Sequence, residues 1–168
     1  TIKGGHRVGL TGDVVVENGK IINIRYISSL NFRIAHQILD CSNSILRYIL
    51  DIQRNQIYNT LIVSSPGAGK TTLLKDLVRK ISSGIPEIYF HGLNVSVVDE
   101  RGEIAAMYQG EPQNDIGTRT DVLENITKPL GIKMALRSMA PQVIIAEKKK
   151  KSEDVQAIEY AICSGVKG

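Results

Sequence analysis

The first part of the chain has the alternation of apolar and polar residues that is typical of β-strands. Segments 14–17 and 20–27 are rich in β-branched residues and flank the dipeptide Asn18-Gly19. Both residues of this dipeptide accept a positive φ, so the pattern predicts a tight β-hairpin. A third strand is expected at 6–10. We therefore expect residues 1–30 to form a small β-hairpin region, the remnant of an N-terminal domain.

From residue 31 the spacing of apolar residues becomes helical. Aliphatic residues recur at about every third or fourth position as far as Asp51, and Asn31 stands where an N-cap is expected. The sequence Cys41-Ser42-Asn43 divides this stretch into two helices in one interpretation, and a single helix is the other. Residues 31–56 are accordingly expected to form a helical connector.

Beyond residue 57, short apolar runs alternate with helical patterns. The expected strands are 60–63, 87–90, 94–98 and 143–146, and the expected helices are 71–81, 132–139 and 152–161. Residues 105–128 are polar and rich in turn formers, and are expected to be a surface excursion. The alternation predicts an α/β core over residues 57–168, with a mainly parallel sheet covered by helices on both faces.

A glycine-rich segment follows the strand expected at 60–63 and opens the helix after it. It reads Ser64-Ser65-Pro66-Gly67-Ala68-Gly69-Lys70-Thr71-Thr72, which departs from the P-loop pattern G-x-x-x-x-G-K-[ST] in having Ser64 for the first glycine. Backbone N–H groups at such a turn bind phosphate, helped by the helix dipole. A chance Gly-Lys-Thr is common, but one between an apolar strand and a leucine-rich helix is not.

The loop therefore predicts a nucleotide site, with ATP and Mg²⁺ as its ligands. The residues from Ser65 to Thr72 are expected to hold the nucleotide. Lys70 would reach the β- and γ-phosphates, and the Thr71 hydroxyl would ligate Mg²⁺.

Acidic residues follow two of the predicted strands at their carboxyl ends, where open α/β sheets bind ligands. Asp99 and Glu100 follow the strand at 94–98, and Glu147 follows the strand at 143–146, in the Walker B position. A P-loop enzyme needs carboxylates beside Mg²⁺ and beside the attacking water. We expect all three acids to be catalytic and Glu147 also to hold Mg²⁺. An ordinary polar loop after a strand is the alternative for the first two.

Several cations are candidates for contact with phosphate. Arg101, Arg119 and Arg137 are expected to sense or neutralise phosphate, in their own site or in a neighbour's, and surface salt bridges are the alternative. The run Lys148–Lys151 is expected to be a solvated turn, with an electrostatic contact to a neighbouring subunit or nucleotide as the other interpretation.

The composition of the chain argues against a nucleic-acid partner, a metal site at the cysteines and a membrane span. The 168-residue chain has a net charge of +4, and a single run supplies four of its lysines, so no nucleic-acid partner is expected. Cys41 and Cys163 lack metal-ligand spacing and are expected to be reduced thiols in a cytoplasmic protein. No apolar stretch approaches the ~18 residues of a membrane span. The chain has no initiating methionine and opens within an expected strand, so a fragment of a longer protein is expected.

Motifs along almost the whole chain resemble one family. They are Gly9-Leu10-Thr11-Gly12, Tyr26-Ile27-Ser28-Ser29-Leu30-Asn31, Ser65 to Leu74, Val97-Val98-Asp99-Glu100-Arg101, Pro112 to Leu123, and Leu136 to Pro141. Together they resemble the stage III sporulation AA family of endospore-forming bacteria, which is similar to the ATPases of type II and type IV secretion systems. The stretch Pro-Gln-Asn-Asp-x-Gly-x-Arg-Thr-Asp is more specific than the P-loop.

The resemblance implies a RecA-like P-loop ATPase that forms a ring, usually a hexamer. It also implies a role in the mother cell, where the protein would be attached peripherally to a membrane-embedded channel complex around the forespore. In the related secretion motors an acid of the segment matching 97–103 polarises water, which points to Asp99 and Glu100. The family reads Val-Asp-Glu-Ile-Gly-Arg where this chain reads Ala146 to Lys151. Glu147 therefore replaces either the Asp or, after a one-residue slip, the Glu.

Two further functions stay open from the sequence. A non-catalytic nucleotide-binding scaffold is favoured by the lysines after Glu147 and by the expected loss of a histidine-containing strand beyond Gly168. A P-loop small-molecule kinase is less favoured, because no arginine-rich lid segment follows the core.

Overall fold

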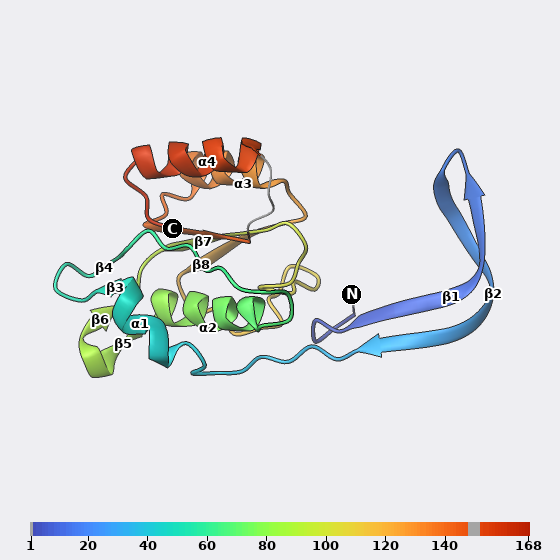
Figure 1. Ribbon diagram of the computed structural model, residues 1–168, viewed down its shortest axis with the longest axis horizontal. Helices are drawn as coiled ribbons and strands as arrows, with labels where there is room; N and C mark the ends of the chain where they lie inside the picture. The colour runs from blue at the N-terminus through green and yellow to red at the C-terminus, as the bar shows by residue number, and fades with distance from the viewer. Residues whose placement is uncertain (1, 148–151) are drawn as a thin grey trace.

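The centre of the molecule is a small parallel sheet between two helical layers, as the computed structural model shows for residues 2–147 and 152–168 (Figure 1). The sheet has the strand order β8-β7-β9. Its strands are β7 (Val95–Asp99), β8 (Thr120–Glu124) and β9 (Val143–Ala146). All five residues of β7 are buried, as expected for a central strand covered on both faces.

The register of the sheet brings the carboxyl ends of the three strands together. Asp99 of β7 pairs with Glu124 of β8, and Val98 pairs with Ala146 of β9, so that Glu147 follows at the same edge. Parallel strands in register necessarily present the residues that follow them on one side of the sheet. The two acidic segments expected at strand ends therefore do lie at a common edge.

One helix covers the first face of the sheet. Helix α2 (Lys70–Ser83) begins after Gly69, whose φ of 82° is a left-handed conformation that glycine adopts without strain. Leu77, Val78 and Ile81 face the sheet and are buried. The helix ends at Gly84, close to the end predicted from the sequence.

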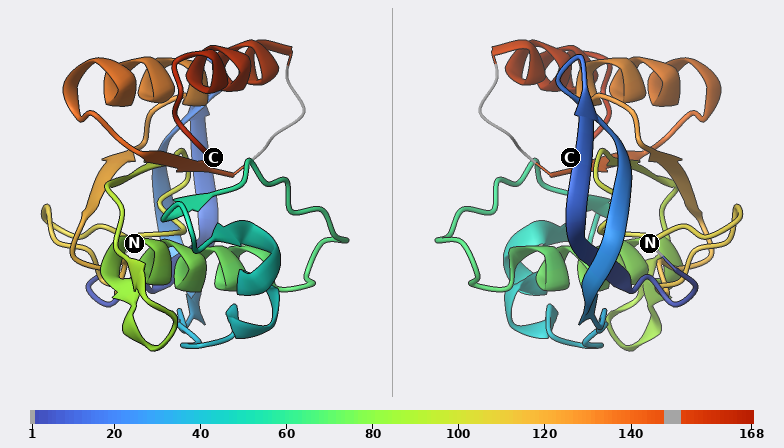
Figure 2. Two further views of the ribbon diagram at one scale, coloured as in Figure 1. Left: turned by 90° about the vertical axis from the view of Figure 1, so that its left-hand side faces the viewer. Right: turned by 90° about the vertical axis from the view of Figure 1, so that its right-hand side faces the viewer.

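Two helices lie side by side on the opposite face (Figures 1 and 2). They are α3 (Lys128–Ser138) and α4 (Ser152–Cys163). Their apolar residues form a second core with Val98 and Ile144 of the sheet. No described helix has both the length and the apolar character that a membrane span requires.

A long hairpin leaves this body beside the N-terminal end of α2, and its tip stands clear (Figures 1 and 2). Strands β1 (Arg7–Glu17) and β2 (Lys20–Arg33) are joined by Asn18 and Gly19, with φ values of 51° and 74°, as predicted for this dipeptide. The separate strand expected at 6–10 is wrong. It is the first part of β1, which continues through a register shift between Thr11 and Asp13.

The helical connector expected at 31–56 is largely wrong. Asn31 is not an N-cap, because it pairs with Gly9 inside β2. The only helix in this range is α1 (Asn43–Ile49), followed by the short strands β3 (Leu50–Asp51) and β4 (Gln56–Ile57). Pairing with β1 keeps residues 31–33 in β2, and residues 34–42 form neither a helix nor a strand.

The strands expected at 60–63 and 87–90 are also wrong. Residues 60–63 form no strand: the Thr60 N–H donates to the Gly168 carbonyl oxygen at 2.7 Å, and Lys167 forms an isolated bridge with Val143 at the start of β9. Pro86 opens a 3₁₀ turn (Pro86–Ile88), which leaves only β6 (Phe90–His91) to pair with β5 (Gly84–Ile85).

The supposed surface excursion at 105–128 is partly core. It contains strand β8, and Ala105 and Ile116 within it are buried. The strand was not recognised because polar residues flank it.

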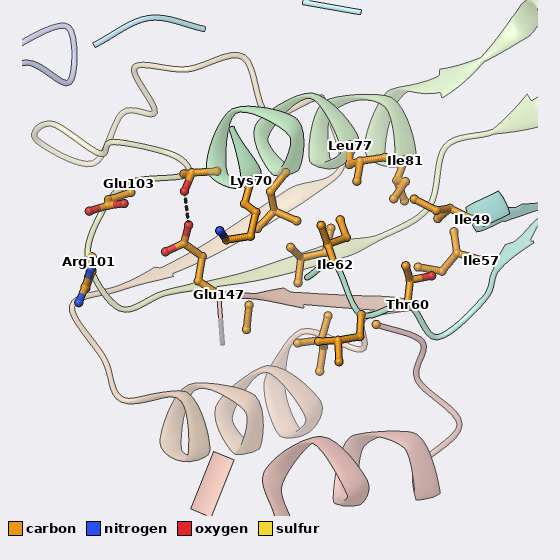
Figure 3. Close-up of a pocket in the computed structure, with 17 residues that line it drawn as sticks. Ile49, Ile57, Thr60, Ile62, Lys70, Leu77, Ile81, Arg101, Glu103 and Glu147 are labelled. Carbon is orange, nitrogen blue, oxygen red and sulfur yellow. Dashed lines mark hydrogen bonds between the residues drawn. The ribbon is translucent and has the colours of Figure 1, made fainter. Parts of the chain in front are cut away.

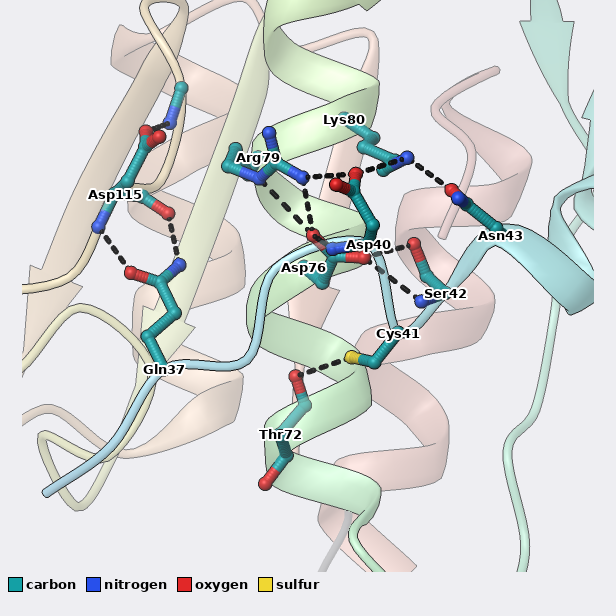
Figure 4. A network of polar contacts seen from close by, with 11 residues as sticks. Gln37, Asp40, Cys41, Ser42, Asn43, Thr72, Asp76, Arg79, Lys80 and Asp115 are labelled. Atoms are coloured by element: carbon teal, nitrogen blue, oxygen red, sulfur yellow. Dashed lines mark hydrogen bonds and ion pairs between the residues drawn. The ribbon is translucent and has the colours of Figure 1, made fainter.

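A polar network fastens the segment before α1 to α2 (Figure 4). Asp76 of α2 is fully buried and accepts hydrogen bonds from the Ser42 backbone N–H (2.9 Å) and the Ser42 hydroxyl (2.6 Å). Arg79 pairs with Asp76 at 2.7 Å and with Asp40 at 3.0 Å. Burial alone would raise the pKa of Asp76, but the hydrogen bonds from Ser42 and Arg79 outweigh it and lower the pKa to about 2.

This network predicts an acid-sensitive contribution to stability. The folded pKa of Asp76 is about 2, below the ordinary 3.8, so the contribution is complete above about pH 4 and is lost as the pH falls toward about 2. Urea unfolding at several pH values should show that the wild type loses about 2 kcal/mol more than Asp76→Asn over this window.

The exposed Asp13 of the hairpin supplies the matched control, because Asp13→Asn should keep the wild-type pH dependence. Equal pH dependence of the wild type and Asp76→Asn would contradict the role assigned to the network.

Candidate nucleotide-binding site

The glycine-rich loop lies open at the N-terminal end of α2. A Cβ atom added to Gly67 or Gly69 would meet no other atom within 4 Å, so the backbone of the loop is accessible from outside. The first turn of α2 has no side-chain cap and no acidic residue. Its free N–H groups and the positive end of the helix dipole therefore face an open space that suits an anion.

Lys70 lies across this loop. Its ammonium donates to the backbone oxygens of Ser64 (3.0 Å) and Ser65 (2.8 Å), and to the Ser64 hydroxyl at 3.2 Å. The lysine is thus held over its own loop by neutral oxygens, and it forms no ion pair with the described residues. A cation held in this way is able to pair with an anion.

Thr71 and Glu147 are hydrogen-bonded at the edge of the sheet, and Figure 3 draws this bond of Glu147 as a dashed line. The Thr71 hydroxyl donates to Glu147 Oε1 at 2.6 Å, although 76 positions separate the two residues in the chain. Thr71 lies in the first turn of α2, and Glu147 directly follows β9. The two residues expected to share Mg²⁺ are therefore brought into direct contact.

These residues border a cavity of about 330 Å³, the size of a small-ligand pocket. One end is polar and is lined by Lys70, Thr71, Arg101, Glu103 and Glu147. The rest is lined mainly by aliphatic side chains of α2, β9 and the segments before the loop. The polar groups converge at the end that adjoins the glycine-rich loop.

Asp99, expected to be catalytic, is a structural residue of the loop after β7. It is only 2% exposed, and its carboxylate accepts hydrogen bonds from the backbone N–H groups of Glu103 (2.9 Å), Ile104 (2.8 Å) and Ala105 (3.1 Å). It does not line the cavity. Its charge holds three N–H groups in place, which fixes the path of residues 100–105.

This arrangement predicts a large loss of stability in Asp99→Ala. Two buried N–H groups and one partly buried N–H group would lose their acceptor, which should lower the free energy of unfolding by about 3 kcal/mol or more. Urea denaturation measures the change, and Asp121→Ala on the exposed side of β8 is the matched control. An Asp99→Ala protein as stable as the wild type would show that the carboxylate does not organise the loop.

Glu100 also turns away from the cavity. Its carboxylate pairs with the amino group of Lys128 at 3.1 Å, and the same amino group lies 3.8 Å from Asp154 of α4. Lys128 is 3% exposed. Glu100 thus connects the loop after β7 to the α3–α4 layer.

The three candidate arginines have different positions. Arg101 lines the cavity. Arg119 donates to the backbone oxygen of Ser82 at the far end of α2, a 14-residue helix about 20 Å long. Arg137 lies exposed in the last turn of α3. Of the three arginines, only Arg101 is therefore close enough to contact a ligand at the glycine-rich loop of the same chain. The run Lys148–Lys151, for which a solvated turn was expected, lies outside the described residues.

Two acids at this edge were missed as individual candidates. Glu103 lines the cavity, where it pairs with Arg7 at 3.2 Å, and its place in the acidic segment after β7 was the available signal. Glu124 ends β8, and its carboxylate accepts from the Met107 N–H at 3.3 Å. Burial raises the pKa of Glu124. It was missed because β8 itself was not predicted.

The fold and site together define an α/β protein with a phosphate-loop sequence at a helix N-terminus, faced by an acid at the end of a parallel strand. Residues 1–167 match the family described as "Sporulation stage III, protein AA", and the chain belongs to that family, which assigns it a role in sporulation.

Among characterised relatives, the chain is similar to Stage III sporulation protein AA of Bacillus subtilis (strain 168), with 43% identity over 166 residues. The match covers 99% of the chain and 52% of the relative, so the chain spans about half the length of that protein. No solved structure matches the chain.

Proposed function

We propose that this chain is the ATP-binding core of a sporulation ATPase with a RecA-like P-loop fold. The contact between Thr71 and Glu147 at 2.6 Å carries the proposal, because it joins the phosphate loop to an acid at the end of a parallel strand. Lys70 lies beside this pair in the same cavity. A chance glycine-rich turn would have no reason to face a carboxylate from a strand 76 positions away.

The loop and Lys70 would bind the phosphates of ATP. The N–H groups at the start of α2 would donate to phosphate oxygens, and Lys70 would exchange its contacts with Ser64 and Ser65 for contacts with phosphate. Arg101 adds a second positive charge at the same end of the cavity.

The donor set at this end suits Mg²⁺ bound together with phosphates. A hydroxyl and a carboxylate are hard oxygen donors, and Mg²⁺ in such sites takes few protein ligands and completes its shell with water and phosphate. Thr71 and Glu147 would hold the ion, which would neutralise charge on the phosphates. Glu147 and Glu103 are the described carboxylates that line the cavity, and either is placed to orient water.

The wider role follows from the family. We propose that the full-length protein forms a ring, a hexamer, in the mother-cell cytoplasm, attached peripherally to membrane-embedded channel proteins of the sporulation complex. The hairpin supports an interaction role, because Val16, Ile21 and Ile27 are each more than half exposed on it.

A nucleotide-binding scaffold is the second candidate. It is supported by the positions of Asp99 and Glu100, which are held by backbone N–H groups and by Lys128 instead of facing the cavity. In this second candidate function, the chain would bind ATP without turning it over.

Calorimetric titration with Mg·ATP and a phosphate-release assay test the proposal together. Binding with release of phosphate supports the ATPase, and binding without release, in a full-length protein as well, supports the scaffold. A chain that binds no nucleotide at millimolar concentration would refute both. Transfer of phosphate to a small-molecule acceptor would indicate a kinase instead.

A further inference from the structure

A second cavity, the hairpin-base pocket, lies where the hairpin joins the body. It measures about 170 Å³, which is room for a small oxyanion and a few waters. Thr71 and Glu103 line it as well as the first cavity, so the two are neighbours. Its walls hold three cations, Arg7, Arg33 and Lys75, against the single carboxylate of Glu103.

Lys75 is the most unusual of these cations. It is 8% exposed, and within the described part of the chain its amino group has no hydrogen bond and no ion pair. The amino nitrogen itself is not enclosed, because Asp154 Oδ2 is the one fully enclosed side-chain N or O atom without a partner in the described part of the chain. Burial of the side chain lowers the pKa of Lys75. Lys75 lines the hairpin-base pocket, so an anion bound there would replace water as the acceptor for its three N–H donors.

The acids around Lys75 do not fill this need, because each has other contacts. Asp99 accepts from three backbone N–H groups, Glu103 pairs with Arg7, and Glu147 accepts from Thr71. Their charges act on Lys75 from a distance without an ion pair within 4.0 Å. Among the described residues, no protein group therefore accepts a hydrogen bond from this amino group.

The two arginines add a second, independent observation. Arg7 and Arg33 are directly opposite each other in the β1–β2 ladder, and like charges in this position destabilise a pair of strands. Glu103 compensates Arg7, whereas the exposed Arg33 has no side-chain partner among the described residues. An anion bound between the ends of these strands and α2 would attract both arginines and so offset their mutual repulsion.

We infer that the hairpin-base pocket, formed by Arg7, Arg33, Lys75 and Thr71, binds a phosphate-type oxyanion. This site adjoins the phosphate loop and shares Thr71 with it, but its three cations lie outside the loop, so it does not require a nucleotide in the first cavity. Its ligand is either free inorganic phosphate or a phosphate group of a nucleotide. A bound oxyanion would connect α2 to the base of the hairpin, because its two arginines and its lysine come from these two elements.

Titration of the chain with inorganic phosphate, and separately with ATP, tests this inference by calorimetry and by amide shifts of Gly5 and Gly102. Lys75→Met and Arg33→Gln should each weaken binding about tenfold, because each removes a charge-assisted hydrogen bond. The matched controls Lys133→Met and Arg137→Gln replace exposed residues of α3 and should change nothing. Arg33 is exposed on β2, so its variant decides the question if Lys75→Met fails to fold.

The pattern of losses identifies the source of the phosphate. Weaker inorganic phosphate binding in both pocket variants, with normal phosphate binding in Lys70→Ala, indicates free phosphate. Weaker ATP binding in the pocket variants, without any binding of inorganic phosphate, indicates a nucleotide phosphate. The inference is overturned if both pocket variants fold and bind both ligands as tightly as the wild type. If Lys70→Ala loses binding and both pocket variants bind normally, the ligand binds at the phosphate loop and the inference is overturned.

Discussion

Replacing Lys70 with alanine is expected to weaken ATP binding by about 10- to 100-fold while leaving the protein folded. Among the described residues, the ammonium of Lys70 donates only to oxygens of its own loop, so its removal breaks no hydrogen bond between elements in that part of the chain. In the variant, the carbonyl oxygens of Ser64 and Ser65 would be left beside the phosphates without a cation between them. The loss should therefore exceed that of a simple missing hydrogen bond.

Calorimetric titration measures the affinity, and thermal unfolding shows whether the fold is intact. Lys133→Ala is the matched control, since Lys133 is an exposed lysine of α3 and lines neither cavity. Equal ATP affinities for Lys70→Ala and the wild type would remove the basis for assigning phosphate binding to this loop.

The second large effect is expected from Glu147→Gln. Glutamine keeps an oxygen that accepts from the Thr71 hydroxyl, so the contact between α2 and the end of β9 should persist. The negative charge, however, is lost. We expect the gain in ATP affinity on adding Mg²⁺ to disappear, and single-turnover phosphate release to fall by about 100-fold or more.

Two comparisons make this result specific. Glu159→Gln removes a carboxylate from the exposed side of α4 and should behave as the wild type. ATP affinity measured without Mg²⁺ should be nearly unchanged in Glu147→Gln, because the phosphate loop and Lys70 are intact. A variant that keeps its Mg²⁺ dependence and its phosphate release would show that another acid, with Glu103 the first candidate, holds the ion.

Asp99 and Glu100, next to the candidate site in sequence, have contacts that stabilise the fold and do not face the cavity. Asp99 and Glu100 are adjacent, yet one is buried under three backbone N–H groups and the other pairs with Lys128. Substitutions of either residue would therefore affect activity indirectly, through the loop or the α3–α4 layer. Unfolding measurements should accompany any assay of such variants, since a loss of turnover by itself would not identify a catalytic group.

Local patterns in the sequence were sufficient for those elements whose conformation depends on near neighbours. The Asn18-Gly19 turn, the start of α2 after Gly69, and the buried strands near 95–99 and 143–146 all follow from backbone preferences and apolar runs. The glycine-rich loop could be recognised as a candidate nucleotide site for the same reason, because the whole loop is contiguous in sequence. Glu147 could be placed at the edge where the acidic segment after β7 emerges, because parallel strands end at a common edge.

Tertiary structure alone decided which side chains point into the site. Successive residues of a strand point to opposite faces, and the loop after it can turn either way, so the sequence could not show that Asp99 and Glu100 leave the cavity while Glu103 lines it. Contacts between distant segments also determined the conformation of residue 31 and the position of the hairpin base. Pairing with β1 kept Asn31 in a strand in place of a helix, and the packing of the hairpin against α2 brought Arg33 near Lys75. These outcomes depend on long-range pairing and burial, for which the local sequence carries no signal.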